Sequence, residues 1–423
     1  MTLKLCLHGV RVAHPETFTE DVAKLLKLTV KQGEMREKEY GENCSARYRR
    51  NKLTGGPLFP FKVRTLEGIL LADARLSDLR DVEFSYSPGS EKLVQAAAHK
   101  LLSGGDGFVL AEPDLKLRLD ALAGKPYPHL SGDKSWLKVM RNELYWQVLI
   151  INWFWYLLHN EPANKLLVRQ LRVKIRRLRS CLVFFKEGLP EASVLRWQTL
   201  FREDAESLSN MRELDVAALA CQRGRILAVN DSAASSPLQD VFLQLRQKEQ
   251  DKFFAVSDLN RYTEVLAEFM LWLDGLPALS LPGRPKENGR RYVDRRLGEW
   301  SDKLISLNKK YPDFSNMEDL HRIRIKVKRF RYVTQTIELA KLPPDLLRQL
   351  KQLQDLLGLL HDDYINAVWA EGIARQHPDD EALQQDVQTF LNWQSARSES
   401  ALAMVPEMWD HFLLILQENV KRN

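Results

Sequence analysis

Two short segments of the chain concentrate side chains that bind phosphate groups in proteins. Residues 171–179 read LRVKIRRLR and residues 323–331 read IRIKVKRFR, so the two segments align without a gap. With the residues just before them, they hold twelve cations and no acid. The cations are Arg169, Arg172, Lys174, Arg176, Arg177, Arg179, Arg322, Arg324, Lys326, Lys328, Arg329 and Arg331. Guanidinium groups favour bidentate contacts with phosphate oxygens, so this composition suits a polyanion.

Without these twelve cations the protein would carry a net negative charge. The 423 residues include 62 Lys or Arg and 56 Asp or Glu, which gives +6. Subtracting the twelve leaves −6 for the rest of the chain. The overall composition, 44% hydrophobic and 28% charged, is that of an ordinary globular protein and excludes a disordered, collagen-like or disulfide-stapled chain. The basic character therefore belongs to two local segments.

Helical geometry arranges these cations in rows. At about 100° per residue, positions 169, 172, 176 and 179 fall within an arc of about 80°, and so do positions 321, 324, 328 and 331. A second row consists of Lys174, Arg177, Arg322, Lys326 and Arg329. The apolar stripe expected to face a helical bundle consists of Leu171, Ile175, Leu178, Ile323, Val327 and Phe330.

Two interpretations of the rows compete. Like charges one helical turn apart destabilise a helix by roughly 0.2–0.5 kcal/mol per pair, so a bound polyanion would relieve the repulsion. Alternatively, each row is a solvated face that acids on neighbouring helices neutralise. Two independent solvated faces have no reason to share the same register, so the exact repetition favours the polyanion.

The segments that position the rows are helical. From Trp136 onward, apolar residues recur at three- and four-residue spacing, and three prolines interrupt the pattern at 277–290. The interruption separates two halves that repeat each other. Each half has a second, looser match, 208–216 in the first and 357–365 in the second. These matches predict an internal duplication of a helical unit.

The first ~135 residues have a different texture. Short stretches at 61–65, 68–71 and 81–86 predict strands, and residues 90–102 predict a helix with a serine N-cap. Residues 122–134 predict a linker. The N-terminal part is therefore expected to be a small α+β module.

The paired motifs resemble those of the CHAD family, the conserved histidine α-helical domain. Its pattern His-x-x-Arg-(Val/Ile)-x-x-(Arg/Lys)-(Arg/Lys)-x-Arg is followed by a Leu-Gly-x-x-(Arg/His)-Asp-like turn. The second copy, from His321 to Tyr332 and from Leu357 to Asp362, is similar to this pattern. In the first copy Arg169 stands where the family has histidine, and Glu213 stands where it has Asp. The resemblance covers residues 137–423.

The resemblance implies a mainly α fold of two pseudo-twofold-related four-helix bundles. It further implies a basic groove between the bundles that binds inorganic polyphosphate, and no catalytic activity. His321, Arg212 and His361 join the twelve motif cations as expected polyphosphate-binding residues. Like charges are expected to lower the pKa of His321 unless phosphate is bound. The expected domains are 1–125, 137–276 and 291–423.

The N-terminal region resembles the late strand and helix of CYTH modules, the triphosphate tunnel fold. The stretch that carries the resemblance is 81–94, DVEFSYSPGSEKLV. The region is short for that fold, and its start, MTLKLC, lacks the Glu-x-Glu-x-Lys signature of the metal-dependent triphosphatases. A truncated, degenerate CYTH module without hydrolase activity is expected.

Other candidate sites are weaker. The four cysteines lie in no zinc-ligand spacing, so reduced thiols are expected. His361, Asp362 and Asp363 invite a metal-site interpretation, but helix termination or an anchoring hydrogen bond is favoured because further ligands are missing. Core packing is favoured over base stacking for Trp146, Trp153, Phe154, Trp155 and Tyr156.

The sequence thus predicts a non-enzymatic protein that binds polyphosphate, without cofactor or metal. Two alternatives stay open: a metal-dependent triphosphatase of the CYTH–CHAD type, and a protein that binds nucleic acid. A cytoplasmic location, with association with polyphosphate granules, is expected because the apolar run at 148–158 is shorter than the ~20 residues that span a bilayer. No membrane partner is expected, and the sequence leaves the oligomeric state open.

Overall fold

The structure is a computed structural model that describes residues 2–41, 43–55, 61–229, 236–279, 281, 283–311, 314 and 316–422. Its contacts divide the chain into two compact units. The first contains Met1–Glu161, Gly188–Ser193 and Ser257–Arg284, and the second contains Pro162–Glu187, Val194–Val256 and Pro285–Asn423. Each unit is described by itself.

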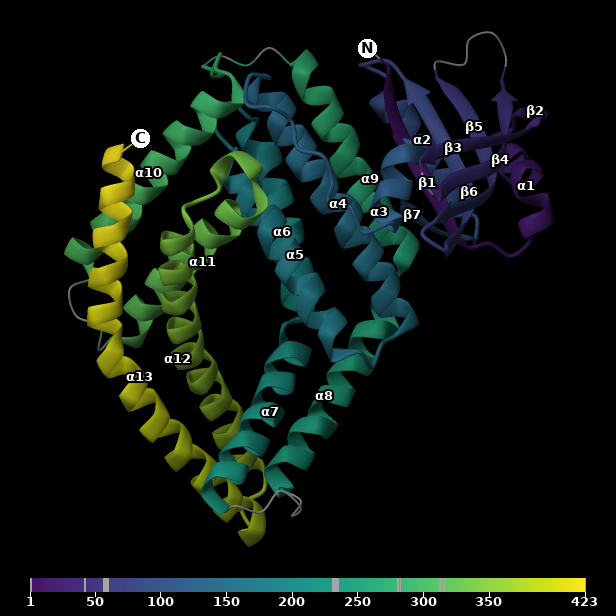
Figure 1. Ribbon diagram of the computed structural model, residues 1–423. Helices are drawn as coiled ribbons and strands as arrows, with labels where there is room; N and C mark the ends of the chain where they lie inside the picture. Colours follow the sequence, from purple (N-terminus) through teal and green to yellow (C-terminus); the bar gives the residue numbers. More distant parts are fainter. Residues whose placement is uncertain are drawn as a thin grey trace. The chain divides into compact units, whose positions relative to one another are not determined.

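The first unit is built on an antiparallel sheet of seven strands (Figure 1). The strands are β1 (Leu3–Arg11), β2 (Thr29–Lys31), β3 (Met35–Gly41), β4 (Cys44–Thr54), β5 (Lys62–Ala72), β6 (Arg75–Tyr86) and β7 (Gly107–Leu110). Their order is β2-β4-β5-β6-β1-β7, and β3 also pairs with β4. The stretches predicted at 61–65 and 68–71 form one strand, β5, and the strand predicted at 81–86 is the second half of β6.

Five α-helices complete the described part of this unit. They are α1 (Phe18–Leu26), α2 (Glu91–Leu102), α3 (Leu115–Leu122), α4 (Trp136–Asn160) and α9 (Leu259–Gly275), with the short 3₁₀ helices η1 (Pro15–Thr17) and η2 (Leu276–Ala278). The prediction of a helix at 90–102 is confirmed by α2. Residues 123–134 form neither helix nor strand, but the contacts group both sides of this segment in one unit, so the linker at 122–134 stays a prediction.

One buried amide joins α4 and α9 to the sheet. Asn152 of α4 is fully buried. Its side-chain oxygen accepts from the backbone N–H of Leu110 at 2.6 Å, and its amide donates to the hydroxyl of Thr263 at 2.9 Å. This pairing explains a polar residue inside the apolar run at 148–158, which is a largely buried helix as predicted. Among the described residues, no helix is long and apolar enough to cross a membrane.

The second unit consists of helices. They are α5 (Lys165–Phe184), α6 (Glu191–Ser207), α7 (Ser209–Val229), α8 (Pro237–Val256), α10 (Gly289–Lys310), α11 (Met317–Thr336), α12 (Pro344–Gln376) and α13 (Glu381–Arg422), with the 3₁₀ helix η3 (Glu338–Ala340).

Two hydrophobic cores hold the second unit together. One core joins α10, α11, α12 and α13 around Trp409, which is fully buried. The other joins α7 and α8 to the distant halves of α12 and α13, with Phe242 and Phe390 in edge contact. Because α12 and α13 are 33 and 42 residues long, they run side by side through both cores (Figure 1). The two sequence halves therefore share a core.

The predicted fold class, mainly helical with a small N-terminal α+β module, is confirmed. Within the interruption at 277–290, the residues that the structure describes form no α-helix before Gly289, where α10 begins. The turn implied for 357–365 is wrong, because that stretch lies inside α12, where its leucines fill the core. The contacts group α4 and α9 with the sheet, and the division into domains at 1–125, 137–276 and 291–423 stays a prediction.

Candidate anion-binding site

Helices α5 and α11 carry the two charged motifs and pack against each other. Both begin at an asparagine cap: the Asn164 side chain accepts from the N–H of Leu166 at 3.0 Å, and the Asn316 side chain accepts from the N–H of Glu318 at 2.9 Å. The apolar stripe predicted from the spacing is buried on both helices. Its members, Leu171, Ile175, Leu178, Ile323, Val327 and Phe330, are at most 1% exposed.

The burial of the stripe directs the first row of cations into a cavity of about 540 Å³. Helices α5, α7, α11, α12 and α13 supply its walls. The basic lining residues are Arg169, Arg172, Arg176, Arg212, Arg223, Arg324, Lys328, His361 and Arg397. The acids in the same walls are Glu213, Asp355 and Asp362. Cations therefore outnumber acids in the lining.

A second cavity of about 340 Å³ continues the first. The two cavities share five lining residues, Arg176, Arg324, Lys328, Tyr332 and His361. The second cavity adds the cationic or titratable residues Arg179, Arg202, His321 and Arg329, and one acid, Glu206. We call the two cavities together the basic groove.

The cations at the junction of the two cavities are buried without matching acids. Arg172 and Arg324 are 7% and 8% exposed. The Nε atoms of Arg172, Arg179 and Arg324 have no acceptor among the described residues. The carboxylate of Asp362 lies 4.0 Å from Arg324 and is itself half exposed, so it offsets little of the charge. Buried charge in this state favours an anionic ligand.

Burial changes the protonation of these groups. It lowers the pKa of Arg172 to about 9, with a contribution from Arg176. Burial, followed by Arg324 and Arg176, lowers the pKa of Lys328 to about 6. Burial and Arg324 also lower the pKa of His321, as predicted from its charged neighbours, and that of His361 to about 3. Below neutral pH the groove therefore gains charge at Lys328.

Five predicted site residues lie outside the walls of the groove, and one of them, Lys326, lines a separate cavity. Arg177 donates to the Gln335 side chain at 3.1 Å. Arg322 is exposed and pairs with Glu318 and, at 3.6 Å, with Asp319. Arg331 lies 3.8 Å from Asp355, and Lys174 lines neither cavity. Arg322 and Arg331 thus have the neighbouring acids that the solvated-face interpretation requires.

Comparison with models of protein families identifies the family of this helical region. The model of the CHAD domain matches residues 157–371, half of the chain. The chain belongs to the CHAD family. It is similar to the crystal structure of the CHAD domain from the plant Ricinus communis, with a TM-score of 0.52 and 18% identity over 67% of this chain and 94% of that one.

A second solved structure is similar at a lower level. PptA from Streptomyces chartreusis has a TM-score of 0.48 and 16% identity over 65% of this chain and 97% of that one. The comparison with curated proteins found no match. Membership of the CHAD family confirms the resemblance stated from the two motifs, while the relation of the N-terminal module to CYTH proteins stays a prediction.

The basic groove includes residues that lie outside the two motifs. Arg223 lies 11 residues after Arg212 on α7, a spacing that returns to the same helix face, so this pair was visible in the sequence. Arg202 of α6 and Arg397 of α13 sit in segments of mixed charge, and only the packing of those helices brings them to the walls. Tyr332 follows the second motif directly.

Asp363 anchors α13 beside the groove. The buried carboxylate accepts from the Arg397 Nε at 3.0 Å, from the Ser398 hydroxyl at 2.9 Å and from the Gln394 amide at 3.3 Å. The prediction of an anchoring hydrogen bond in this stretch is confirmed, whereas helix termination is wrong because α12 continues to Gln376. Among the described residues, no group of His, Cys, Asp and Glu is arranged to hold a metal.

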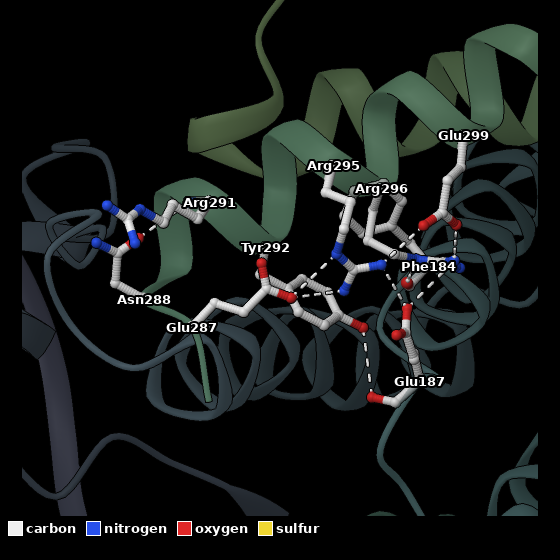
Figure 2. Close-up of polar contacts among 9 residues, drawn as sticks. All are labelled: Phe184, Glu187, Glu287, Asn288, Arg291, Tyr292, Arg295, Arg296 and Glu299. Atoms are coloured by element: carbon white, nitrogen blue, oxygen red, sulfur yellow. Dashed lines mark hydrogen bonds and ion pairs between the residues drawn. The ribbon is translucent and has the colours of Figure 1, made fainter. Parts of the chain in front are cut away.

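A second ionic network fixes the C-terminal end of α5 against the start of α10 (Figure 2). Arg296 is buried, and its Nε donates to the backbone carbonyl of Phe184 at 3.0 Å. Arg295 donates to Glu187 at 2.8 Å, to Glu287 at 2.7 Å and to Glu299 at 2.7 Å. These contacts hold the end of α5 in place and engage the nearby carboxylates.

Replacing the partly buried amine of Lys328 should stabilise the protein. We expect Lys328→Met to raise the free energy of unfolding at pH 7 by about 1–3 kcal/mol, because the chain would no longer desolvate an amine among arginines. The pKa of Lys328 is about 6 in the folded protein and has the usual value for lysine in the unfolded chain. Between these two pH values the unfolded chain therefore binds more protons than the folded protein. Wild-type stability should therefore rise with pH across this window and approach that of the variant.

Urea denaturation at several pH values measures both effects. Lys351→Met on the exposed surface of α12 is the control, with an expected change within about 0.5 kcal/mol. A loss of stability in Lys328→Met, or a gain that is independent of pH, would contradict the description of Lys328 as an unpaired, partly buried amine.

Proposed function

We propose that this protein binds inorganic polyphosphate in the basic groove and acts as a polyphosphate-binding or granule-targeting module. The observation that carries the proposal is the junction of the two cavities, where Arg176, Arg324 and Lys328 meet with too little acid to balance them. Arg172 adds a buried cation in the wall of the first cavity. Membership of the CHAD family supports it. No catalytic step is needed, because binding alone relieves the repulsion.

The shape and lining of the groove favour a chain anion without bases. The cations follow α5 from Arg169 to Arg179, which is about 15 Å at 1.5 Å per residue. A phosphoanhydride chain carries charge along its whole length and can use successive cations. Among the described lining residues, Tyr332 is the only Trp, Tyr or Phe, so the groove offers little surface for stacking nucleic-acid bases.

The aromatic residues considered for stacking lie elsewhere. Trp146 and Trp155 are each 5% exposed and stack on Tyr127 and Tyr262, respectively, inside the first unit. Trp153 is 45% exposed. Core packing, as predicted, accounts for the two buried tryptophans and removes them as a platform for nucleic acid.

The N-terminal sheet is part of the proposal as a CYTH-like module without hydrolase activity. The buried Glu83 is held by Lys4 at 3.0 Å and Arg64 at 3.1 Å. The buried Asp81 accepts from His8 at 2.9 Å and from Arg118. Because these carboxylates already have cationic partners, metal-dependent triphosphatase activity is the less favoured function. Phosphate release from tripolyphosphate with magnesium or manganese would favour it.

Charge reversal inside the groove should abolish binding. We expect Arg172→Glu combined with Arg324→Glu to weaken the binding of long-chain polyphosphate by at least about 100-fold, since each change removes a buried cation and adds an anion. Calorimetric titration or fluorescence anisotropy measures the affinity. The matched control is Arg177→Glu with Arg322→Glu, which makes the same change in charge on the same two helices outside the groove.

The control variant should lose less than about tenfold, through long-range electrostatics alone. Equal losses in both double variants would contradict a site in the groove and indicate attraction to overall charge. Displacement of polyphosphate by RNA at comparable phosphate concentration would favour the nucleic-acid alternative. Absence of any polyphosphate binding by the wild type would refute the proposal.

Binding should take up protons. Phosphate near Lys328 and His321 stabilises their charged forms and raises pKa values that burial lowers in the free protein. Affinity should therefore fall as the pH rises above about 6. Long chains serve as the ligand because their internal phosphates keep one charge each over this range.

Calorimetry in two buffers of different ionisation enthalpy measures the uptake at neutral pH. Lys328→Met should take up fewer protons than the wild type, whereas Lys351→Met should behave as the wild type does. Unchanged proton uptake in Lys328→Met would contradict the assignment to Lys328.

A further inference from the structure

A third basic cavity, of about 260 Å³, lies where α10 and α11 pass the end of α5. Its cationic walls include Lys186, Lys303, Lys326 and Arg329. Its apolar walls include Trp300 and the buried Phe330. The cavity therefore combines several charges with a surface of low polarity, which strengthens ionic interactions.

The four cations lack acidic partners. Among the described residues, no carboxylate forms an ion pair with Lys186, Lys303, Lys326 or Arg329. In the network of Figure 2, Arg295 and Arg296 engage the carboxylates of Glu187 and Glu299. The cavity thus has the same excess of cations as the basic groove.

The pKa values of two cations that line this cavity are lowered. Burial, followed by Arg329 and Lys303, lowers the pKa of Lys326. Burial also lowers the pKa of Arg329. An anion bound between α10 and α11 would reverse both effects, since opposite charge favours the protonated form of each group.

The cavity adjoins the basic groove. Arg329 and Val183 line both this cavity and the second cavity of the groove. Along α5, the distance from Arg172 to Val183 is about 17 Å at 1.5 Å per residue. A chain of three phosphates is shorter than this distance, whereas a long chain extends beyond it. A polyanion in the groove can therefore reach the third cavity only if it is long.

We propose that the cavity lined by Lys186, Lys303, Lys326 and Arg329 is a second phosphate-binding subsite, which makes affinity depend on the length of the polyphosphate chain. The inference rests on the proposed function of the basic groove. It also gives a role to Lys326 and Arg329, which belong to the second row of the motif and face away from the junction of the groove.

The test compares two ligands with one double variant. Lys303→Glu with Lys326→Glu changes two exposed side chains of the subsite and leaves Arg329, which the groove shares, intact. We expect affinity for long-chain polyphosphate to fall at least about tenfold and affinity for tripolyphosphate to change less than about twofold. Circular dichroism of the variant checks that it is folded.

Lys248→Glu with Lys351→Glu is the matched control, because it makes the same change in net charge on exposed side chains outside all three cavities. It should affect the two ligands equally and weakly. A loss for long chains no greater than in this control overturns the subsite and leaves the proposed function standing. An equal loss for both ligands also overturns the role in chain length. If the wild type binds neither ligand, the proposed function itself fails.

Discussion

The excess of buried cations between α5 and α11 is the constraint on which the second unit depends. Arg172, Arg324 and Lys328 repel one another in a setting with little acid. The apolar seam beneath them and the two asparagine caps supply compensating stability at the ends and along the length of both helices. A hydrophobic replacement would be more stable, and under the proposed function a bound polyanion offsets this cost.

The supporting contacts show how the fold tolerates this repulsion. The acids Asp363 and Asp215 bind arginines of the following helices, Arg397 and Arg246, and so fix α12 to α13 and α7 to α8. At the other end, Arg296 donates to the backbone carbonyl of Phe184, the last residue of α5. The acids are thus placed where they join helices, and few are left in the groove. The same distribution of charge leaves the third cavity without acid and makes it available as an extension.

The repeated spacing made part of this site predictable. A period of 3.6 residues is enough to predict which motif cations share a face and which apolar residues form the seam, and both predictions agree with the burial of Leu171 and Ile323. The contributions of Arg202 and Arg397 were not predictable, because they depend on the packing of α6 and α13. In the N-terminal module, β1 is buried on both faces and β3 is exposed on both, so neither has the alternation that predicts a strand.

The dependence of binding on salt tests the central claim most directly. A polyanion that neutralises several groove cations releases counterions, so the logarithm of the binding constant should fall linearly with the logarithm of salt concentration. We predict a steep slope for long-chain polyphosphate with the wild type, measured by titration at several salt concentrations. Binding that is independent of salt, or no binding at low salt, would contradict the account of an unbalanced basic groove.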